Sequence, residues 1–457
     1  MNMNSETSSP AHKRLERKLG LFPCTNIVVA NMIGTGIFTT SGLLMSGLDN
    51  PLLMIFLWIF GGVLALCGAL SYGELGAAIP EAGGEYAFLS RIFHPVFGFL
   101  SGWVSFVAGF SAPIAASAIG FTEYFSRAFP EFFSWCEAGG LIGQVVLKKL
   151  MALFVIALFT MIHVRGVEFG TRVQNFLTIM KVGLIGILIV IGFSFGTGDF
   201  HHIVEHNVFT FDFSGWKTIG LSLMWIMFAY SGWNASTYIG SEIRNPRRNL
   251  PLSLLTGTVL VMVLYLCLNI FYVYAISPED MKGVISIGGL AVGNSLGTSL
   301  GNLFSLMIAF ALFSSLSAFI ILGPRVYYSM AHDGLFFRFA ADIHPVFKVP
   351  VKAIVLQGII SVVMVLSGTF DQILTYMGFS LGIFPILSVC GVFILRKKGI
   401  GSIQFPGYPV VQGLYVLTTG CILILAFFQR PVESSVALLT VISGIPAYFR
   451  FRKNSNV

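Results

Sequence analysis

The feature that most constrains this chain is a series of long apolar runs joined by short polar links. A helix needs about 20 mostly apolar residues to cross a bilayer, and these runs are continuous, whereas a transmembrane β-barrel would show short alternating segments. The sequence therefore predicts about twelve spanning helices, with ten or eleven as the alternative because two runs are short. The runs lie at approximately 24–44, 52–73, 96–122, 150–164, 173–194, 216–240, 252–275, 300–328, 353–368, 373–395, 409–428 and 432–449.

Composition points to the same class of protein. Only 10 % of the 457 residues are charged, against about 25 % in soluble proteins, so too little polar surface remains to coat a water-soluble body. This excludes a soluble enzyme, a disordered tail protein and a small disulfide scaffold. The net charge is +7, but the basic residues lie in short clusters between apolar runs rather than on one face. We therefore expect the lipid bilayer as a partner, and no nucleic acid.

The distribution of Lys and Arg predicts the orientation. With twelve spans, the two termini and the even-to-odd links carry 20 of the 27 basic residues, the opposite side carries 6, and one lies inside a span. Short cytoplasmic loops are enriched in Lys and Arg, so we expect both termini in the cytoplasm, with 1–20 as a polar arm and 451–457 as a tail. The first apolar run is too long for the core of a signal peptide.

Two of the apolar runs contain glycines where a continuous helix would be expected. Gly34 and Gly36 lie in the middle of the first run, and Gly232 lies in the middle of the sixth. Glycines in membrane helices usually serve close packing, but interrupted helices in corresponding positions of two halves are typical of secondary transporters. We also expect Pro51 and Pro251 to open the helices that follow the two interruptions.

The spacing of the interruptions predicts the domain organisation. The second interruption comes five spans after the first, and five is odd, so successive units must be inverted relative to each other. We expect a first five-helix repeat at 21–195, a second inverted repeat at 216–395 and two further helices within 405–450.

A broken helix at membrane depth presents unpaired backbone groups, which determine what it can bind. Free N–H groups at the start of a half-helix favour an anion, and free carbonyls at the end of a half-helix favour a cation. Two such breaks facing each other fit a zwitterion, so an α-amino acid is the expected ligand. No Asp or Glu lies near the middle of any predicted span, and an unpaired buried charge is costly. Neutral side chains are therefore favoured.

Lys181 is the basic residue that lies inside a predicted span. An ionisable residue within the membrane is a functional hypothesis by default, and we expect a role as a proton carrier or as a fixed cation. The alternative is a lysine that extends along its helix to reach the cytoplasmic surface.

Four blocks of sequence are similar to motifs of one known family. Residues 31–38 read NMIGTGIF, similar to Ile-Gly-(Ser/Thr)-Gly-Ile-Phe, and residues 72–86 read YGELGAAIPEAGGEY, similar to Tyr-x-Glu-Leu…Pro…Gly-Gly-x-Tyr. Residues 228–251 begin FAYSGWN and end EIRNPRRNLP, and residues 323–334 read GPRVYYSMAHDG. Together these blocks resemble the amino acid–polyamine–organocation (APC) superfamily, most closely its L-type amino acid transporter (LAT) branch, in a bacterial-looking form.

The resemblance implies an all-α polytopic membrane protein of the LeuT-like fold, with two inverted five-helix repeats and with helices 1 and 6 broken. It implies that the substrate carboxylate meets backbone amides of helix 1 and that the substrate amine meets backbone carbonyls of both helices. It also implies that Lys181 is the family's helix 5 lysine, near a position where other branches hold sodium. The substrate-binding residues that it implies are Met32, Ile33, Gly34, Thr35, Gly36, Ile37, Phe228, Ala229, Ser231, Trp233 and Asn234.

The function implied is secondary active transport of neutral L-α-amino acids across the plasma membrane, here the bacterial inner membrane, by exchange or proton symport and without sodium. The alternatives are sodium-coupled or cationic amino acid transport, with Ser314, Ser315 and Ser317 as hydroxyls that could hold sodium. From a different class, a membrane-embedded enzyme or a channel is disfavoured. We expect no enzymatic activity, no cofactor and no metal site. Some relatives bind a partner subunit through an external cysteine, but the surroundings of Cys136 argue against this.

Overall fold

The computed structural model describes residues 17, 19–81, 83–139, 143–165, 167–204, 209–347, 349–400 and 404–455, with the side chains of 167–175 and 453–455 excepted. Every long regular element in these ranges is helical. The longer helical elements, with the π-helical turn η1 between two of them, are α1 (Leu21–Met32), α2 (Thr35–Leu48), α3 (Pro51–Ala78), α5 (Pro95–Val104), η1 (Ser105–Gly109), α6 (Ser111–Ala128), α8 (Gln144–Val164), α9 (Val167–Phe195), α10 (Phe213–Ala229), α11 (Pro246–Ala275), α14 (Thr298–His332), α15 (Val351–Ser367), α16 (Phe370–Lys397), α17 (Val410–Gln429) and α18 (Pro431–Ser455).

The remaining elements are short. Four of them are α-helices and four are single 3₁₀ turns. They are α4 (Glu85–Ile92), α7 (Pro130–Ala138), α12 (Pro278–Met281), α13 (Ile287–Leu296), η2 (Phe200–Ile203), η3 (Ala235–Tyr238), η4 (Gly240–Glu242) and η5 (Arg338–Ala341).

The predicted class, an all-helical polytopic membrane protein, is confirmed. Within the described residues, ten helical segments are long and apolar enough to cross a membrane, counting α1 with α2 and α5 with α6 as single segments. The run predicted at 150–164 is longer than expected, because α8 begins at Gln144. α10 and α15 have 17 residues each and are not among these ten, so the predicted count of twelve is not confirmed.

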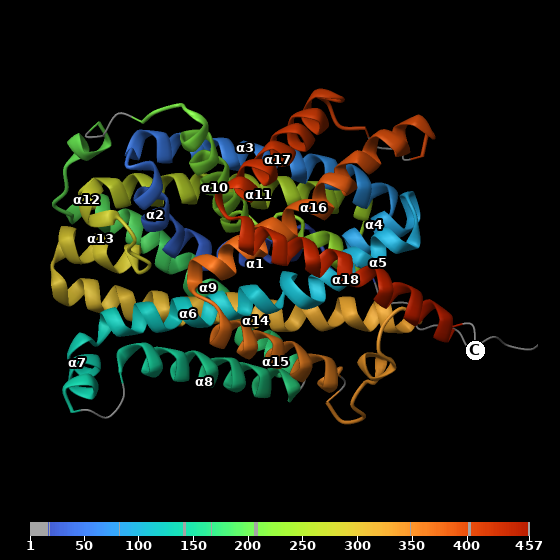
Figure 1. Cartoon of the computed structure of the whole chain (residues 1–457), viewed down its shortest axis with the longest axis horizontal. Coiled ribbons are helices and arrows are strands. Elements are labelled where there is room, and N and C mark those ends of the chain that lie inside the picture. Colours follow the sequence, from blue (N-terminus) through green and yellow to red (C-terminus); the bar gives the residue numbers. More distant parts are fainter. Residues whose placement is uncertain are drawn as a thin grey trace, which may run out of the picture.

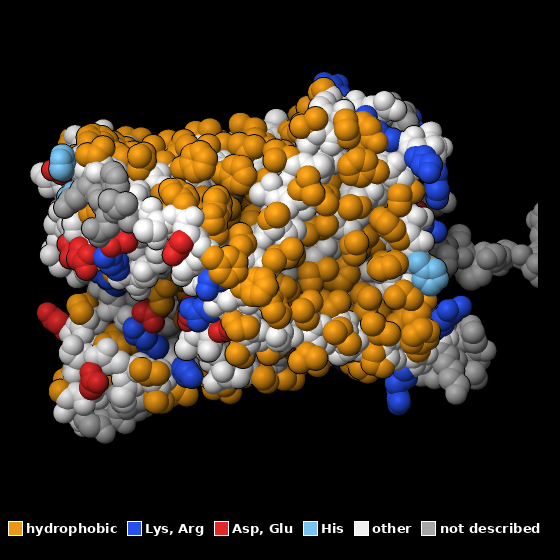
Figure 2. Space-filling model, turned by 45° about the horizontal axis from the view of Figure 1, so that its top comes forward, with side chains coloured by type: hydrophobic (Ala, Val, Ile, Leu, Met, Phe, Trp, Pro, Cys, Tyr) orange, Lys and Arg blue, Asp and Glu red, His pale blue; other side chains and the backbone are white. Residues whose placement is uncertain are grey.

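The helices run roughly parallel along the long axis of the molecule (Figure 1). α7, α12 and α13 lie at one end, and the C-terminus lies at the other, which we call the C-terminal end. Figure 2 shows hydrophobic side chains over most of this face, with Lys and Arg at the C-terminal end and, together with Asp and Glu, toward the opposite end. Among the large apolar side chains on the surface are those of Phe154, Ile179 and Leu417, as expected for a surface solvated by lipid.

Corresponding helices of the two predicted repeats contact one another. The second helix of each repeat pairs as α3 with α11, the third as α6 with α14, and the fourth as α8 with α15. The first helices meet through α2 with α10 and α1 with η3. This pairing places the two broken helices at the centre of the molecule.

Two details of the second broken helix differ from the prediction. The expected helix at 216–240 ends at Ala229 and continues as 3₁₀ turns. The prediction that Pro251 opens the next helix is wrong, because α11 begins five residues earlier, at Pro246. Pro251 has no amide hydrogen and so cannot donate to the carbonyl of Arg247, four residues earlier. The helix tolerates this because Arg247 is an exposed residue in the first turn, where water can bond its carbonyl.

An ion pair connects α3 to α16 near the C-terminal end. Nε and Nη2 of Arg396 each lie 2.7 Å from an oxygen of Glu74, and Nη2 also donates to the carbonyl of Phe405 at 3.0 Å. The side chains of Glu74 and Arg396 are 5 % and 14 % exposed. The glutamate of the Tyr-x-Glu-Leu block therefore has a structural partner.

Replacing Arg396 with Met is expected to lower the free energy of unfolding by about 3–5 kcal/mol, because it leaves the Glu74 carboxylate buried without its partner. Thermal unfolding of the purified protein in detergent measures the loss. Arg91→Met is the matched control, since it removes an exposed pair with Glu81 and should cost less than about 1 kcal/mol. Equal stability of the two variants would contradict the prediction.

Candidate functional site

The first helix is interrupted where the sequence predicts it. α1 ends at Met32, whose successor Ile33 donates its amide to Val29 at 3.0 Å, and α2 begins at Thr35. Gly34 is the N-cap of α2 and has no side chain with which to cap the helix. The amides at the start of α2 therefore form the kind of helix N-terminus that favours an anion.

The second interruption follows α10 and depends on one glycine. The amide of Ser231 donates to the carbonyl of Phe228 at 2.8 Å, which tightens the last turn. Gly232 has a φ of +99°, in the left-handed region that side chains other than glycine rarely adopt. The chain then continues into η3 instead of a second α-helix.

The two interruptions are in direct contact. A Cβ atom at Gly36 would lie 2.4 Å from the Cα of Ala229, and a Cβ at Gly232 would lie 2.8 Å from the carbonyl carbon of Asn31. The hydroxyl of Tyr265 lies 2.6 Å from the carbonyl oxygen of Met32 and 3.0 Å from that of Ala229. Glycine is required at both positions because only a residue without Cβ allows the backbones this close.

Lys181 points into the protein and binds the end of α1. Its side chain is fully buried, and its Nζ donates to the carbonyl of Ala30 at 2.9 Å and to the carbonyl of Ile33. The alternative, extension to the membrane surface, is therefore excluded for this conformation. The negative end of the α1 dipole stabilises the ammonium group.

Serines of α14 surround the same point. Ser315 donates to the carbonyl of Ile33 at 3.1 Å, and Ser314 lies 3.2 Å from the hydroxyl of Thr178. Ser317 lies farther along α14 and contacts the buried ring of His163 at 2.9 Å. Lys181 and Ser315 thus share one helix 1 carbonyl, and Ser317 is directed elsewhere.

A cavity of about 110 Å³ lies beside the interruption that follows α10. Of the predicted substrate residues, four line this cavity: Phe228, Ser231, Trp233 and Asn234. The others do not line it in this conformation, because Gly36 packs on Ala229 and Gly232 packs on Asn31. Those others are Met32, Ile33, Gly34, Thr35, Gly36, Ile37 and Ala229.

The opposite wall of the cavity comes from the third span. Here α5 continues into the π-helical turn η1, and Ser105, Gly109 and Phe110 face the cavity. Single π-helical turns inside α-helices occur frequently at functional sites.

A family model described as amino acid permease matches residues 19–445. The chain belongs to this family. It is 27 % identical to the serine/threonine exchanger SteT of Bacillus subtilis, over 96 % of this chain and 98 % of the relative. It is also 27 % identical to the mouse large neutral amino acids transporter small subunit 2 (95 % and 81 % covered) and to the mouse b(0,+)-type amino acid transporter 1 (96 % and 88 % covered).

Membership in the amino acid permease family confirms the resemblance found in the sequence, the LeuT-like fold and amino acid transport as the function. The protein is a multi-pass membrane transporter whose substrate is an amino acid.

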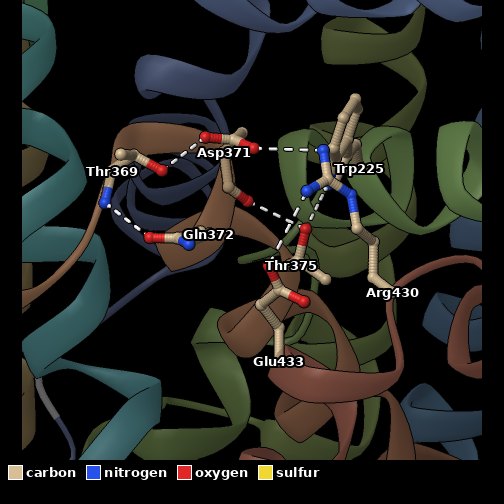
Figure 3. Close-up of polar contacts among 7 residues, drawn as sticks. All are labelled: Trp225, Thr369, Asp371, Gln372, Thr375, Arg430 and Glu433. Carbon is tan, nitrogen blue, oxygen red and sulfur yellow. Dashed lines mark hydrogen bonds and ion pairs between the residues drawn. The ribbon is translucent and has the colours of Figure 1, made fainter.

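A polar network fixes the last turns of α10 in this permease (Figure 3). The indole Nε1 of Trp225 donates to Thr375 at 3.1 Å, and Thr375 donates to the carbonyl of Asp371 at 2.8 Å. Arg430 lies 3.1 Å from the Asp371 carboxylate and 3.7 Å from that of Glu433. The hydrogen bond of Trp225 therefore fixes α10 to α16 four residues before α10 ends at Ala229.

Trp233, which lines the cavity, packs against Tyr72 on α3. Their ring centroids lie 4.7 Å apart at an interplanar angle of 79°, which is an edge-to-face geometry. Tyr72 donates to Oε1 of Glu85 at 2.8 Å, and Asn234 donates to the same oxygen at 3.0 Å.

Sequence reasoning missed Glu85 as a cavity residue because it lies in the link between two apolar runs. The Gly-Gly pair before it was the available signal. Gly83 and Gly84 have φ values of +109° and +54°, and they turn the chain so that Glu85 starts α4 facing the cavity.

Cys136 lies on α7, at the end opposite the C-terminus (Figure 1). It is a free cysteine and its residue is 8 % exposed.

Gly36→Ala is expected to destabilise the protein by about 1–3 kcal/mol, because its Cβ would overlap the backbone of α10, and to abolish amino acid exchange by separating the two breaks. Thermal unfolding and exchange in proteoliposomes measure the two effects. Gly183→Ala on α9 is the control, since no atom lies within 4 Å of its added Cβ. An active, stable Gly36→Ala variant would show that the close contact is dispensable.

Proposed function

We propose that this permease is a secondary active transporter of neutral L-α-amino acids, working by alternating access as an exchanger or proton-coupled symporter without sodium. The observation that carries the proposal is the direct contact of the two broken helices with Lys181 bound at the end of α1. An uncapped helix N-terminus for a carboxylate lies beside backbone carbonyls for an amine, which suits the two charges of an amino acid.

The walls of the cavity support a neutral side chain. Phe110, Phe228 and Trp233 supply apolar surface, and Ser231 and Asn234 supply hydroxyl and amide groups. The relatives include a serine/threonine exchanger and a transporter of large neutral amino acids. The small volume of the cavity and the Ser231 side chain favour the smaller members of this class.

Lys181 supports transport without sodium. Its ammonium group binds carbonyls that a sodium ion at this point would need, and two cations compete for one electrostatic position. In this proposal Lys181 provides the fixed charge or carries the coupled proton.

The proposal includes the topology and the units that move. Both termini are cytoplasmic, the membrane is the bacterial inner membrane, and 21–195 and 216–395 are the two inverted repeats. One bundle rocks against the other around the site formed by Gly36 and Ser231. A partner subunit linked through Cys136 is not part of the proposal, because the burial of this thiol argues against an intersubunit disulfide.

Uptake of labelled alanine into proteoliposomes tests the substrate class. We expect unlabelled serine, and more weakly leucine, to inhibit uptake, arginine to leave it unchanged, and replacement of sodium by potassium to have no effect. Uptake of labelled arginine that ignores neutral competitors would refute the substrate class, and collapse of uptake without sodium would refute sodium independence.

Lys181→Ala tests the coupling role. The substitution removes the ammonium group from the end of α1, so we expect alanine uptake to lose its dependence on an imposed pH gradient. Lys352→Ala is the control, because Lys352 is an exposed lysine paired with Asp342. A Lys181→Ala variant with the pH dependence of the parent would refute the role of Lys181.

A further inference from the structure

Glu85 is a buried carboxyl group that faces the substrate cavity and has no cationic partner among the described residues. It is 7 % exposed and is the first residue of α4. Both of its hydrogen bonds to Oε1 come from neutral donors, Tyr72 on α3 and Asn234 after α10. The carboxyl group thus links a complete helix to the broken helix.

The groups around Glu85 on every packed element are neutral or otherwise engaged. Tyr72 faces it from α3, Ser101 from α5, Tyr238 from η3 and Tyr415 from α17. α16 also packs against α4, but of its two basic residues Arg396 is paired with Glu74 and Lys397 is exposed.

On α4 itself, Arg91 is paired with Glu81. An ionised carboxylate at this position would be a buried charge without a counter-ion, which is costly. Burial accordingly raises the pKa of Glu85 from its usual 4.5 to about 7.

α4 contributes side chains to the linings of both the substrate cavity and a second, wider cavity. This second cavity has a volume of about 1080 Å³, and Tyr86, His332 and Asp333 are among the residues that line it. Glu85 faces the inner cavity, and its neighbour Tyr86 faces the wider one and donates to the carboxylate of Asp333. Consecutive side chains of one helix therefore face the two compartments.

We call α4, with the turn at Gly83 and Gly84 that precedes it, the partition. It contacts η3, the segment that follows the break after α10. The amide of Gly83 donates to the carbonyl of Tyr238 at 3.2 Å, and a Cβ at Gly84 would lie 2.8 Å from the Tyr238 ring. Asn234 joins this contact, since its amide group lies 3.4 Å from the Tyr238 hydroxyl. A change in the charge of Glu85 acts on Asn234 directly and on this docking contact through it.

We propose that Glu85 is a proton-binding site that controls the partition between the two cavities: the neutral acid keeps the partition closed, and ionisation opens it by drawing water to the carboxylate. Protonation also keeps the closed substrate cavity free of a negative charge, which gives a further reason for the proposed preference for neutral amino acids. This inference therefore rests on the proposed function. The proton comes from water in the wider cavity and returns there.

The direction of the pH effect follows from the raised pKa. A carboxyl group with a higher pKa in the closed state than in the hydrated open state binds a proton on closing. The closed state is fully favoured below the ordinary pKa of 4.5 and loses its advantage as the pH rises to about 7. Opening is therefore easier at neutral than at acidic pH.

Alanine counterflow in proteoliposomes, measured at equal pH on both sides from pH 5 to 8, tests the proposal. In the parent protein the rate should rise as the pH increases toward about 7. Glu85→Gln, which is neutral at every pH, should lose this dependence, while Glu81→Gln, which removes an exposed carboxylate on the same link, should keep it. A Glu85→Gln variant with the pH profile of the parent would overturn the proposal.

Infrared absorption of the purified protein gives a second measurement that does not require transport. The parent should show a carboxylic acid band that disappears as the pH rises through about 7 and that Glu85→Gln lacks. Persistence of this band in Lys181→Ala would support Glu85 as a separate site even if the coupling role of Lys181 failed. Absence of the band in the parent, or inhibition by arginine that Glu85→Gln removes, would show an ionised carboxylate and overturn the proposal.

Discussion

The structure depends on the contact between two interrupted helices at its centre. Gly36 lies against the backbone of Ala229, and Gly232 lies against Asn31, so backbone meets backbone with no side chain between them. Such a contact leaves polar main-chain groups at membrane depth, where each must find a partner inside the protein. Tyr265, Lys181 and Ser315 are buried polar residues that serve this need.

The interior deals with charge in three distinct ways. The carboxylate of Glu74 pairs with Arg396. The ammonium of Lys181 binds carbonyls at the end of α1, where the helix dipole supplies the opposite sign. Glu85 has neutral donors alone, which favours the protonated acid. The first solution fixes two helices together, whereas the other two involve the groups for which we propose a change of charge during transport.

Patterns in the sequence were sufficient to predict the helical membrane fold, the first break and the buried lysine. Each of these follows from local residue types: a long apolar run, a Gly-x-Gly within it, and one basic residue far from both ends of a run. The end of the second break was harder to predict, because whether residues 235–240 form an α-helix or 3₁₀ turns depends on docking against α4. Pro251 was misassigned because a proline marks the first turns of a helix without fixing which residue begins it.

The lining of the cavity beside α10 was predicted in part. Phe228, Ser231, Trp233 and Asn234 line it, since they follow or flank the end of α10. The residues around Gly34 do not line it, and the reason is a tertiary contact with Ala229 that no local pattern contains. Glu85 was overlooked for the same reason, because its burial arises from α3, α5 and α17 closing around a link that is polar in sequence.

The hydroxyl of Tyr265 lies within reach of two carbonyl oxygens, those of Met32 and Ala229. A hydroxyl has one proton to donate, so at any moment one of these carbonyls is bonded by it and the other is available to a different donor. An ammonium group arriving at either carbonyl can therefore be accepted by a shift of one proton through a small angle. Tyr265 keeps one hydrogen bond in that shift, and the carbonyls of Met32 and Ala229 then each have a donor.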